Sequence, residues 1–188
     1  MNVQVSGFLD RKLTRRFQTF DSDADGYVER SDFETSAHAL ADEFGHGPDA
    51  AARTGLVHLS RGLWEHLATA ADADSDGQIT EAEYKRAFAD GLLVTPDSFE
   101  LGYRPFLQAI MTIADTDGTG RLSVDEHIRW TRALMNLPES DARDIHRRLD
   151  ADGDGQITTE DLLTAIYDFY FDEDPEGPGG WLLGKLPG

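Results

Sequence analysis

The chain contains no cysteine, so neither a disulfide framework nor a thiolate metal site can be part of it. Basic residues are scarce as well, since 17 Lys and Arg stand against 36 Asp and Glu, and the formal net charge is −19. Such a charge disfavours nucleic acid and anionic membranes as partners and favours multivalent cations. No apolar run approaches the ~18 residues that a membrane span needs.

Other absences concern catalysis and targeting. The sequence has no Ser/His/Asp set, phosphate-binding P-loop or nucleophile elbow, which predicts that the protein is not an enzyme. The first twenty residues lack the apolar segment of a secretory signal, and Met1-Asn2 is not an N-myristoylation start, so we expect a cytoplasmic protein. Six histidines lack metalloprotease spacing and are expected at the surface or half-buried with satisfied hydrogen bonds: His38, His46, His58, His66, His127 and His146.

One twelve-residue segment, residues 72–83, has a suitable oxygen donor at each position that a calcium loop requires. Asp occupies its first, third and fifth positions, so three carboxylates can converge on one point in a tight loop. Gly77 at the sixth position allows the sharp turn, the seventh residue offers its backbone carbonyl, and the twelfth closes the shell with two oxygens. The predicted ligands are Asp72, Asp74, Asp76, Gln78 and Glu83.

Nearly the same pattern occurs three more times. We number the segments loop 1 (residues 21–32), loop 2 (72–83), loop 3 (115–126) and loop 4 (150–161). Together they hold fifteen acids at positions 1, 3, 5 and 12, so much of the excess acid has a fixed place. The further predicted ligands are Asp21, Asp23, Asp25, Tyr27 and Asp32 in loop 1, Asp115, Asp117, Thr119, Arg121 and Glu126 in loop 3, and Asp150, Asp152, Asp154, Gln156 and Asp161 in loop 4.

Loops 1 and 4 close with Asp, which is one methylene shorter than Glu. Closure with two oxygens then requires the loop to contract, or else one oxygen is lost. Ca²⁺ takes six to eight oxygen ligands, whereas Mg²⁺ prefers six at shorter distances. We therefore predict up to four Ca²⁺ ions, with Mg²⁺ as a competitor in loops 1 and 4. The alternative is that these two loops bind no metal.

Apolar residues recur at helical spacing on both sides of every loop, which predicts an all-α protein of four helix-loop-helix units. A single unit cannot bury its apolar face, so the first should pair with the second and the third with the fourth, forming two lobes. Within each pair we expect a short antiparallel strand contact between the loops, with Val28 beside Ile79 and Leu122 beside Ile157. The predicted lobes are residues 1–91 and 92–171.

Residues 172–188 form a tail that is rich in Pro and Gly and ends with several apolar side chains. We predict that Trp181, Leu182, Leu183 and Leu186 dock this tail on the body of the protein. The alternative is a plug that covers a groove between the lobes and is released when calcium binds.

The D-x-D-x-D-G loops identify a resemblance to the EF-hand calcium-binding proteins. Loop starts are unevenly spaced and the chain has only three Met, which resembles sarcoplasmic calcium-binding proteins and their calerythrin-type bacterial relatives more than the Met-rich calmodulins. The segment 174–182, DPEGPGGWL, is similar to the tail of bacterial members. Members often lack one functional loop, whereas all four patterns are present here, so a count of three sites does not carry over.

The resemblance implies a monomer that buffers or transports calcium ions. The alternative is a sensor that exposes an apolar groove to a target protein when loaded. Photoproteins and luciferin-binding proteins share this architecture, which makes a binder of a small apolar ligand the third interpretation. The last helix reads Asp168-Phe169-Tyr170 where photoproteins bring a His and an aromatic partner to the substrate, so an oxygenase is disfavoured.

Overall fold

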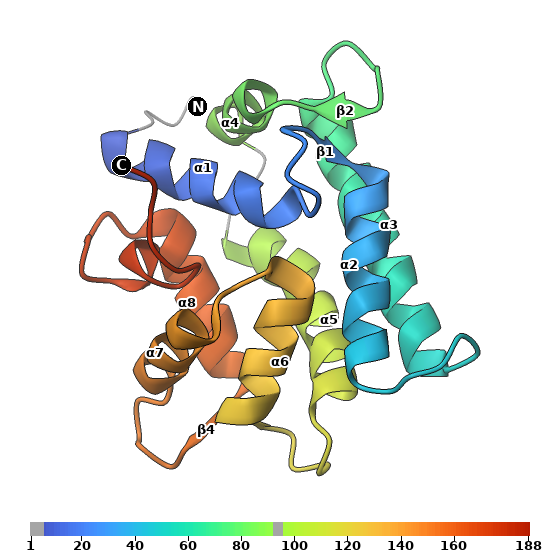
Figure 1. The fold of residues 1–188 in the computed structure, drawn as a ribbon. Helices are drawn as coiled ribbons and strands as arrows, with labels where there is room; N and C mark the ends of the chain where they lie inside the picture. Colours follow the sequence, from blue (N-terminus) through green and yellow to red (C-terminus); the bar gives the residue numbers. More distant parts are fainter. Residues whose placement is uncertain (1–5, 92–95) are drawn as a thin grey trace.

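Eight α-helices and four two-residue strands make up the computed structural model over residues 6–91 and 96–188, the part of the chain that the structure describes (Figure 1). Each loop carries one strand and joins two helices, so the predicted all-α fold of four helix-loop-helix units is confirmed. The elements are α1 (Gly7–Phe20), β1 (Val28–Glu29), α2 (Arg30–Glu43), α3 (Ala51–Ala71), β2 (Gln78–Ile79), α4 (Glu81–Ala89), α5 (Pro96–Ala114), β3 (Leu122–Ser123), α6 (Val124–Met135), α7 (Glu139–Leu149), β4 (Gln156–Ile157), α8 (Thr159–Phe171) and a 3₁₀ turn, η1 (Pro178–Gly180).

Two antiparallel strand pairs join the loops in the predicted register. Val28 pairs with Ile79 between β1 and β2, and Leu122 pairs with Ile157 between β3 and β4. These four side chains are at most 1 % exposed, because the eighth position of each loop points away from the acidic side and into the core. The β1–β2 pair and β4 lie at opposite ends of the molecule (Figure 1).

The apolar core is shared by the two halves of the chain. Helix α2 packs against both α3 and α6, and α3 packs against α5. Leu13, Leu40, Ile110 and Leu162, which come from both halves, belong to one buried cluster. The division at residues 91 and 92 stays a prediction, and residues 92–95 lie outside the described part of the chain.

An arginine on α6 reinforces this packing at the end of α2. The Arg129 Nε donates a hydrogen bond to Glu43 Oε1 at 2.9 Å, and its Nη2 donates to the Glu43 backbone carbonyl at 2.6 Å. The guanidinium also lies over the Phe44 ring, 4.2 Å from its centroid. The positive charge thus binds the negative, C-terminal end of α2 and ties the first half of the chain to the second.

The histidine prediction is wrong at two positions. His127 on α6 and His146 on α7 are only 1 % and 4 % exposed, and their ring centroids are 5.5 Å apart. Each lies on the inward face of its helix, where the two helices pack together. The four other histidines are exposed or half-buried, as expected. No helix among the described residues is both long and apolar enough to cross a membrane.

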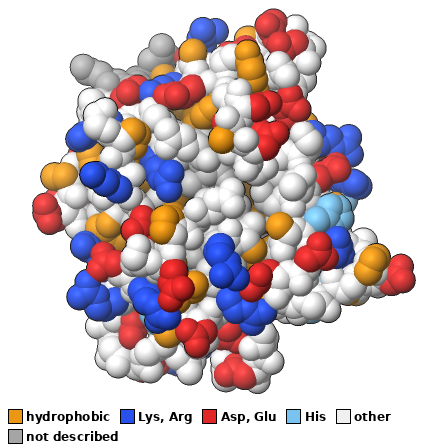
Figure 2. All heavy atoms as spheres, viewed as in Figure 1, with side chains coloured by type: hydrophobic (Ala, Val, Ile, Leu, Met, Phe, Trp, Pro, Cys, Tyr) orange, Lys and Arg blue, Asp and Glu red, His pale blue; other side chains and the backbone are white. Residues whose placement is uncertain are grey.

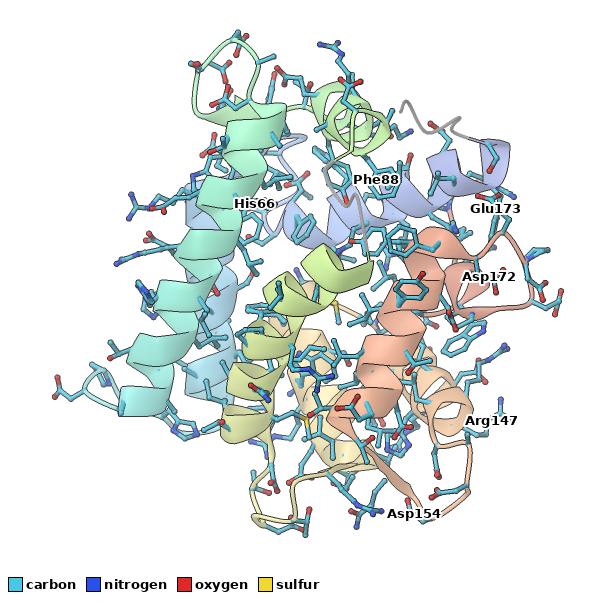
Figure 3. The ribbon with its side chains drawn as sticks, turned by 180° about the vertical axis from the view of Figure 1, so that it is seen from behind. His66, Phe88, Arg147, Asp154, Asp172 and Glu173 are labelled. Carbon is cyan, nitrogen blue, oxygen red and sulfur yellow. The ribbon has the colours of Figure 1, made fainter. Side chains whose placement is uncertain are left out.

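The tail lies against α1, α7 and α8. Lys12 Nζ donates to the Asp172 carbonyl at 2.7 Å, and Arg15 Nε donates to the Leu183 carbonyl at 2.7 Å. Seen from behind, Asp172 and Glu173 lie beside the first turns of α1 (Figure 3). Leu182 and Leu183 are 7 % and 6 % exposed and belong to the main apolar cluster.

Truncating the two buried tail leucines should therefore destabilise the whole molecule. We expect Leu182→Ala and Leu183→Ala each to lower the free energy of unfolding by about 2–5 kcal/mol, because each leaves a cavity in a packed core. Denaturant titration measures the change, and Lys185→Ala, at an exposed position of the same tail, is the control. Leucine variants that unfold like the control would show that the tail is detached in solution.

Candidate metal centres

The first Asp of each loop organises the backbone around it. In loop 3, the Gly120 N–H donates to one Asp115 oxygen at 2.7 Å, and the Thr119 N–H donates to the other at 3.0 Å. The equivalent pairs of hydrogen bonds in the other loops lie between 2.8 and 3.2 Å. The sixth-position glycines have φ between 76° and 93°, a left-handed conformation that residues with a Cβ rarely adopt. The turn that this glycine permits brings the carboxylates together.

Three carboxylates converge in every loop, with one oxygen from each lying within 4.8 Å of the other two. In loops 1, 2 and 4 the three are the predicted Asp residues at positions 1, 3 and 5. Loop 3 has Thr119 at position 5, and there Glu126 joins Asp115 and Asp117. Hard oxygen donors gathered this closely fit a hard divalent cation such as Ca²⁺.

The closing acids of all four loops have a second role as helix caps. Glu126 accepts hydrogen bonds from the Ser123 N–H at 2.9 Å and the Ser123 hydroxyl at 2.8 Å, at the start of α6. Its other oxygen accepts from the Thr116 N–H at 2.7 Å, near the start of the loop. Asp32, Glu83 and Asp161 cap their helices in the same way but do not join the three-carboxylate clusters. One side chain thus connects the loop to the helix that follows it.

These hydrogen bonds also keep the closing glutamates ionised. Hydrogen bonds from the backbone and side chain of Thr80 hold the pKa of Glu83 below its ordinary value. Burial alone would raise the pKa of Glu126, but hydrogen bonds from Thr116 and Ser123 outweigh that effect and lower it. Both groups are therefore carboxylates at neutral pH and ready to accept a cation.

The seventh residues of two loops reach across to the neighbouring loop. The Gln78 side-chain amide donates to Glu29, and the Arg121 guanidinium forms an ion pair with Asp154, a predicted ligand of loop 4. Asp154 lies on its loop away from the helices (Figure 3). The sequence pattern describes each loop separately, so it could not predict an ion pair between two loops. Arg121 would compete with a cation for the Asp154 carboxylate.

The sequence pattern also did not predict that the backbone of the fourth residue in every loop is left-handed. Ala24 and Ser75 have φ of 59° and 61°, and Gly118 and Gly153 occupy the same conformation in loops 3 and 4. The recurrence of glycine at this position in two loops was the available signal. Loops 1 and 2 therefore carry about 1 kcal/mol of backbone strain each that loops 3 and 4 avoid.

Comparison with known proteins gives matches over most of the chain. A family model described as an EF-hand domain pair matches residues 10–89, and another, described as an EF hand, matches residues 147–166. Calerythrin of Saccharopolyspora erythraea is 31 % identical over 161 residues, which cover 85 % of this chain and 90 % of the relative. Sarcoplasmic calcium-binding protein 1 of Astacus leptodactylus is 26 % identical over 176 residues, covering 89 % and 90 %.

A solved structure agrees with these sequence matches. It is described as the structural basis for prokaryotic calcium-mediated regulation by a Streptomyces coelicolor calcium-binding protein. The two chains are 36 % identical with a TM-score of 0.77, and the match covers 86 % of this chain and 97 % of the other.

Replacing a closing glutamate should remove one binding event. We expect Glu126→Gln to lower the calorimetric calcium stoichiometry by about one ion per chain, because the amide keeps the shape but lacks the charge that the cation needs. Asp125→Asn is the matched control, since it removes the same charge from the adjacent side chain, which is 81 % exposed. An unchanged stoichiometry in Glu126→Gln would contradict the assignment of this ligand.

Proposed function

The chain belongs to the EF-hand calcium-binding proteins of the calerythrin and sarcoplasmic type, and on that premise we propose that it buffers or transports calcium ions through all four loops. The observation that carries the proposal is that every loop gathers three carboxylates within 4.8 Å. The proposed ligands are the twenty residues predicted from the loop pattern, with the seventh residue of each loop acting through its backbone carbonyl. A cytoplasmic location and a monomeric state stay predictions.

Chelation follows from the charges and hydrogen bonds of the loops. The carboxylates of one loop repel one another, and a divalent cation between them replaces that repulsion with attraction. Because the closing acid caps the next helix, its movement toward a cation is transmitted to the start of that helix. The strand pairs Val28–Ile79 and Leu122–Ile157 couple the two sites of each pair.

The negative net charge of the whole chain also favours calcium binding. Four Ca²⁺ ions carry eight positive charges and would change the formal net charge from −19 to about −11. Self-repulsion of the folded chain would fall, and binding to the folded state alone stabilises it by mass action. Calcium should therefore raise the melting temperature of the protein.

The distribution of apolar side chains supports a buffer over a sensor. Among the described residues, the exposed large hydrophobic side chains are Tyr27, Leu101 and Phe171. The face seen in Figure 2 has charged side chains of both signs interspersed with scattered apolar ones. The core is common to both halves, so opening one pair of units would disrupt packing throughout the molecule. The description of the Streptomyces relative as a regulator keeps the sensor as the alternative.

A dye that fluoresces on apolar surfaces separates the two interpretations. We expect little change in its fluorescence when calcium is added, and no calcium-dependent retention on a hydrophobic resin, because the apolar side chains stay in the shared core. Calmodulin in the same assay is the positive control. A large calcium-dependent increase with strong retention would overturn the buffer and favour a sensor with a protein target.

Competition by magnesium tests the difference between Asp and Glu closure. In millimolar Mg²⁺ we expect weaker calcium binding at two of four sites, because the shorter Asp32 and Asp161 suit a six-ligand ion better. The variant Asp32→Glu/Asp161→Glu should lose most of this magnesium sensitivity in calorimetric titrations. Four equal sites in the unmodified chain, all insensitive to Mg²⁺, would contradict the assignment.

A partly open cavity favours a second function, the binding of a small molecule. The cavity has a volume of about 90 Å³ and is lined by side chains from α1, α2, α3, α5, α6, α7, α8 and the tail. Its lining is mostly apolar, and Leu182 and Leu183 of the tail form part of the wall. This volume is the space open to the centre of a water-sized sphere, and one water needs ~10–15 Å³ of it. The cavity could therefore hold roughly six to nine waters, or a ligand of about a dozen heavy atoms.

A further inference from the structure

Arg16 places a positive charge at the cavity wall, and no acidic side chain of the described residues forms an ion pair with it. Arg16 on α1 lines the cavity, and its guanidinium is largely surrounded by protein. Among the described residues, no carboxylate lies within ion-pair distance of its guanidinium. A cation removed from water without a counter-charge is costly, so an unpaired arginine at this place requires an explanation.

The groups around Arg16 are neutral. Its Nε donates to the Tyr170 hydroxyl at 3.1 Å, and its Nη2 lies 3.5 Å from the Tyr103 hydroxyl. Burial raises the pKa of both phenols, so neither supplies a negative charge at neutral pH. The guanidinium also donates to the Thr19 hydroxyl at 3.4 Å and lies over the Phe20 ring, whose centroid is 4.1 Å away.

The acid that shares the cavity wall is already engaged. One oxygen of Asp32 accepts from the Ser22 N–H and hydroxyl at 2.9 and 2.8 Å, and the other accepts from the Glu29 N–H at 2.8 Å. These bonds orient the Asp32 carboxylate toward loop 1, where it is a proposed metal ligand. It is therefore not the counter-charge of Arg16.

Two residues that line the cavity also carry a buried polar atom with no hydrogen-bond partner among the described residues. Trp130 Nε1 and His127 Nδ1 are buried without a hydrogen bond to any described residue, and both side chains line the cavity. Their rings meet edge to face, with centroids 5.3 Å apart. The indole N–H can only donate, so Trp130 Nε1 is an unsatisfied buried donor in a residue that lines the cavity.

We propose that the cavity binds a small amphipathic carboxylate, whose anionic group pairs with Arg16 and whose apolar body packs against Phe20, Phe33 and Phe106. This inference rests on the second proposed function and names its ligand class. A charge-assisted hydrogen bond to a guanidinium selects the anion over a neutral molecule of the same shape. The aromatic and aliphatic lining selects an apolar body over a free inorganic ion.

A matched pair of probes tests the charge requirement on the full, calcium-loaded chain. We expect 4-phenylbutyrate to bind about tenfold more tightly than 4-phenylbutan-1-ol in calorimetric titrations, because only the acid pairs with the guanidinium. Arg16→Gln should bring the two affinities within about twofold, while Arg16→Lys should retain part of the preference. Arg147→Gln, which removes a charge from a side chain that is 75 % exposed, is the control and should leave the preference unchanged.

The outcomes separate this inference from the functions on which it rests. Equal affinity of the acid and the alcohol for the unmodified chain would overturn the anion requirement and leave a neutral apolar ligand in the cavity. Binding of neither probe would overturn both the inference and the second proposed function, while the calcium stoichiometry tests the first independently. A preference that persists in Arg16→Gln would place the anion elsewhere and overturn the assignment. If Arg16→Gln fails to fold, the ratio of the acid and alcohol affinities, measured in the unmodified chain and in Arg16→Lys, still tests whether the anion pairs with Arg16.

Discussion

Repulsion between carboxylates that the chain holds within 4.8 Å of one another is the constraint on which the rest of the structure depends. Two like charges about 4 Å apart near a protein surface repel by about 4 kcal/mol, and each loop holds three. Backbone N–H groups at positions 5 and 6 offset part of this repulsion by donating to the first Asp, as Thr119 and Gly120 do to Asp115. A divalent cation completes the compensation, which is why calcium chelation is the function that best fits the loops.

The loops are coupled to the fold at two points. The closing acid caps the following helix, and the eighth residue pairs with its counterpart in the neighbouring loop. Each predicted ligand set is therefore connected to both a helix start and the core. Helices α2 and α6 then pack together, with Arg129 on the end of α2, and connect the two halves. Asp32, the predicted closing ligand of loop 1, also lines the cavity, so the proposed metal site and the proposed ligand site share a residue.

The sequence alone was sufficient for the features that depend on local spacing. The acids, the turn glycine and the apolar eighth residue all lie within twelve positions, so the loops, their helices and the Val28–Ile79 register could be predicted. Contacts between distant segments could not. The Arg121–Asp154 ion pair, the burial of His127 and the position of Arg16 at a cavity depend on how the units pack, and the pattern of one loop has no information on that packing. The ligand assignments and the domain boundaries remain predictions.

Equilibrium dialysis of the metal-stripped chain against calcium, with a parallel melting curve, measures whether the four loops bind the cation. We expect about four bound ions per chain at saturation and a melting temperature that rises with the free calcium concentration, because the cation relieves repulsion only in the folded loops. A stripped protein that retains no calcium above the dialysate, and melts at the same temperature with and without it, would contradict the account.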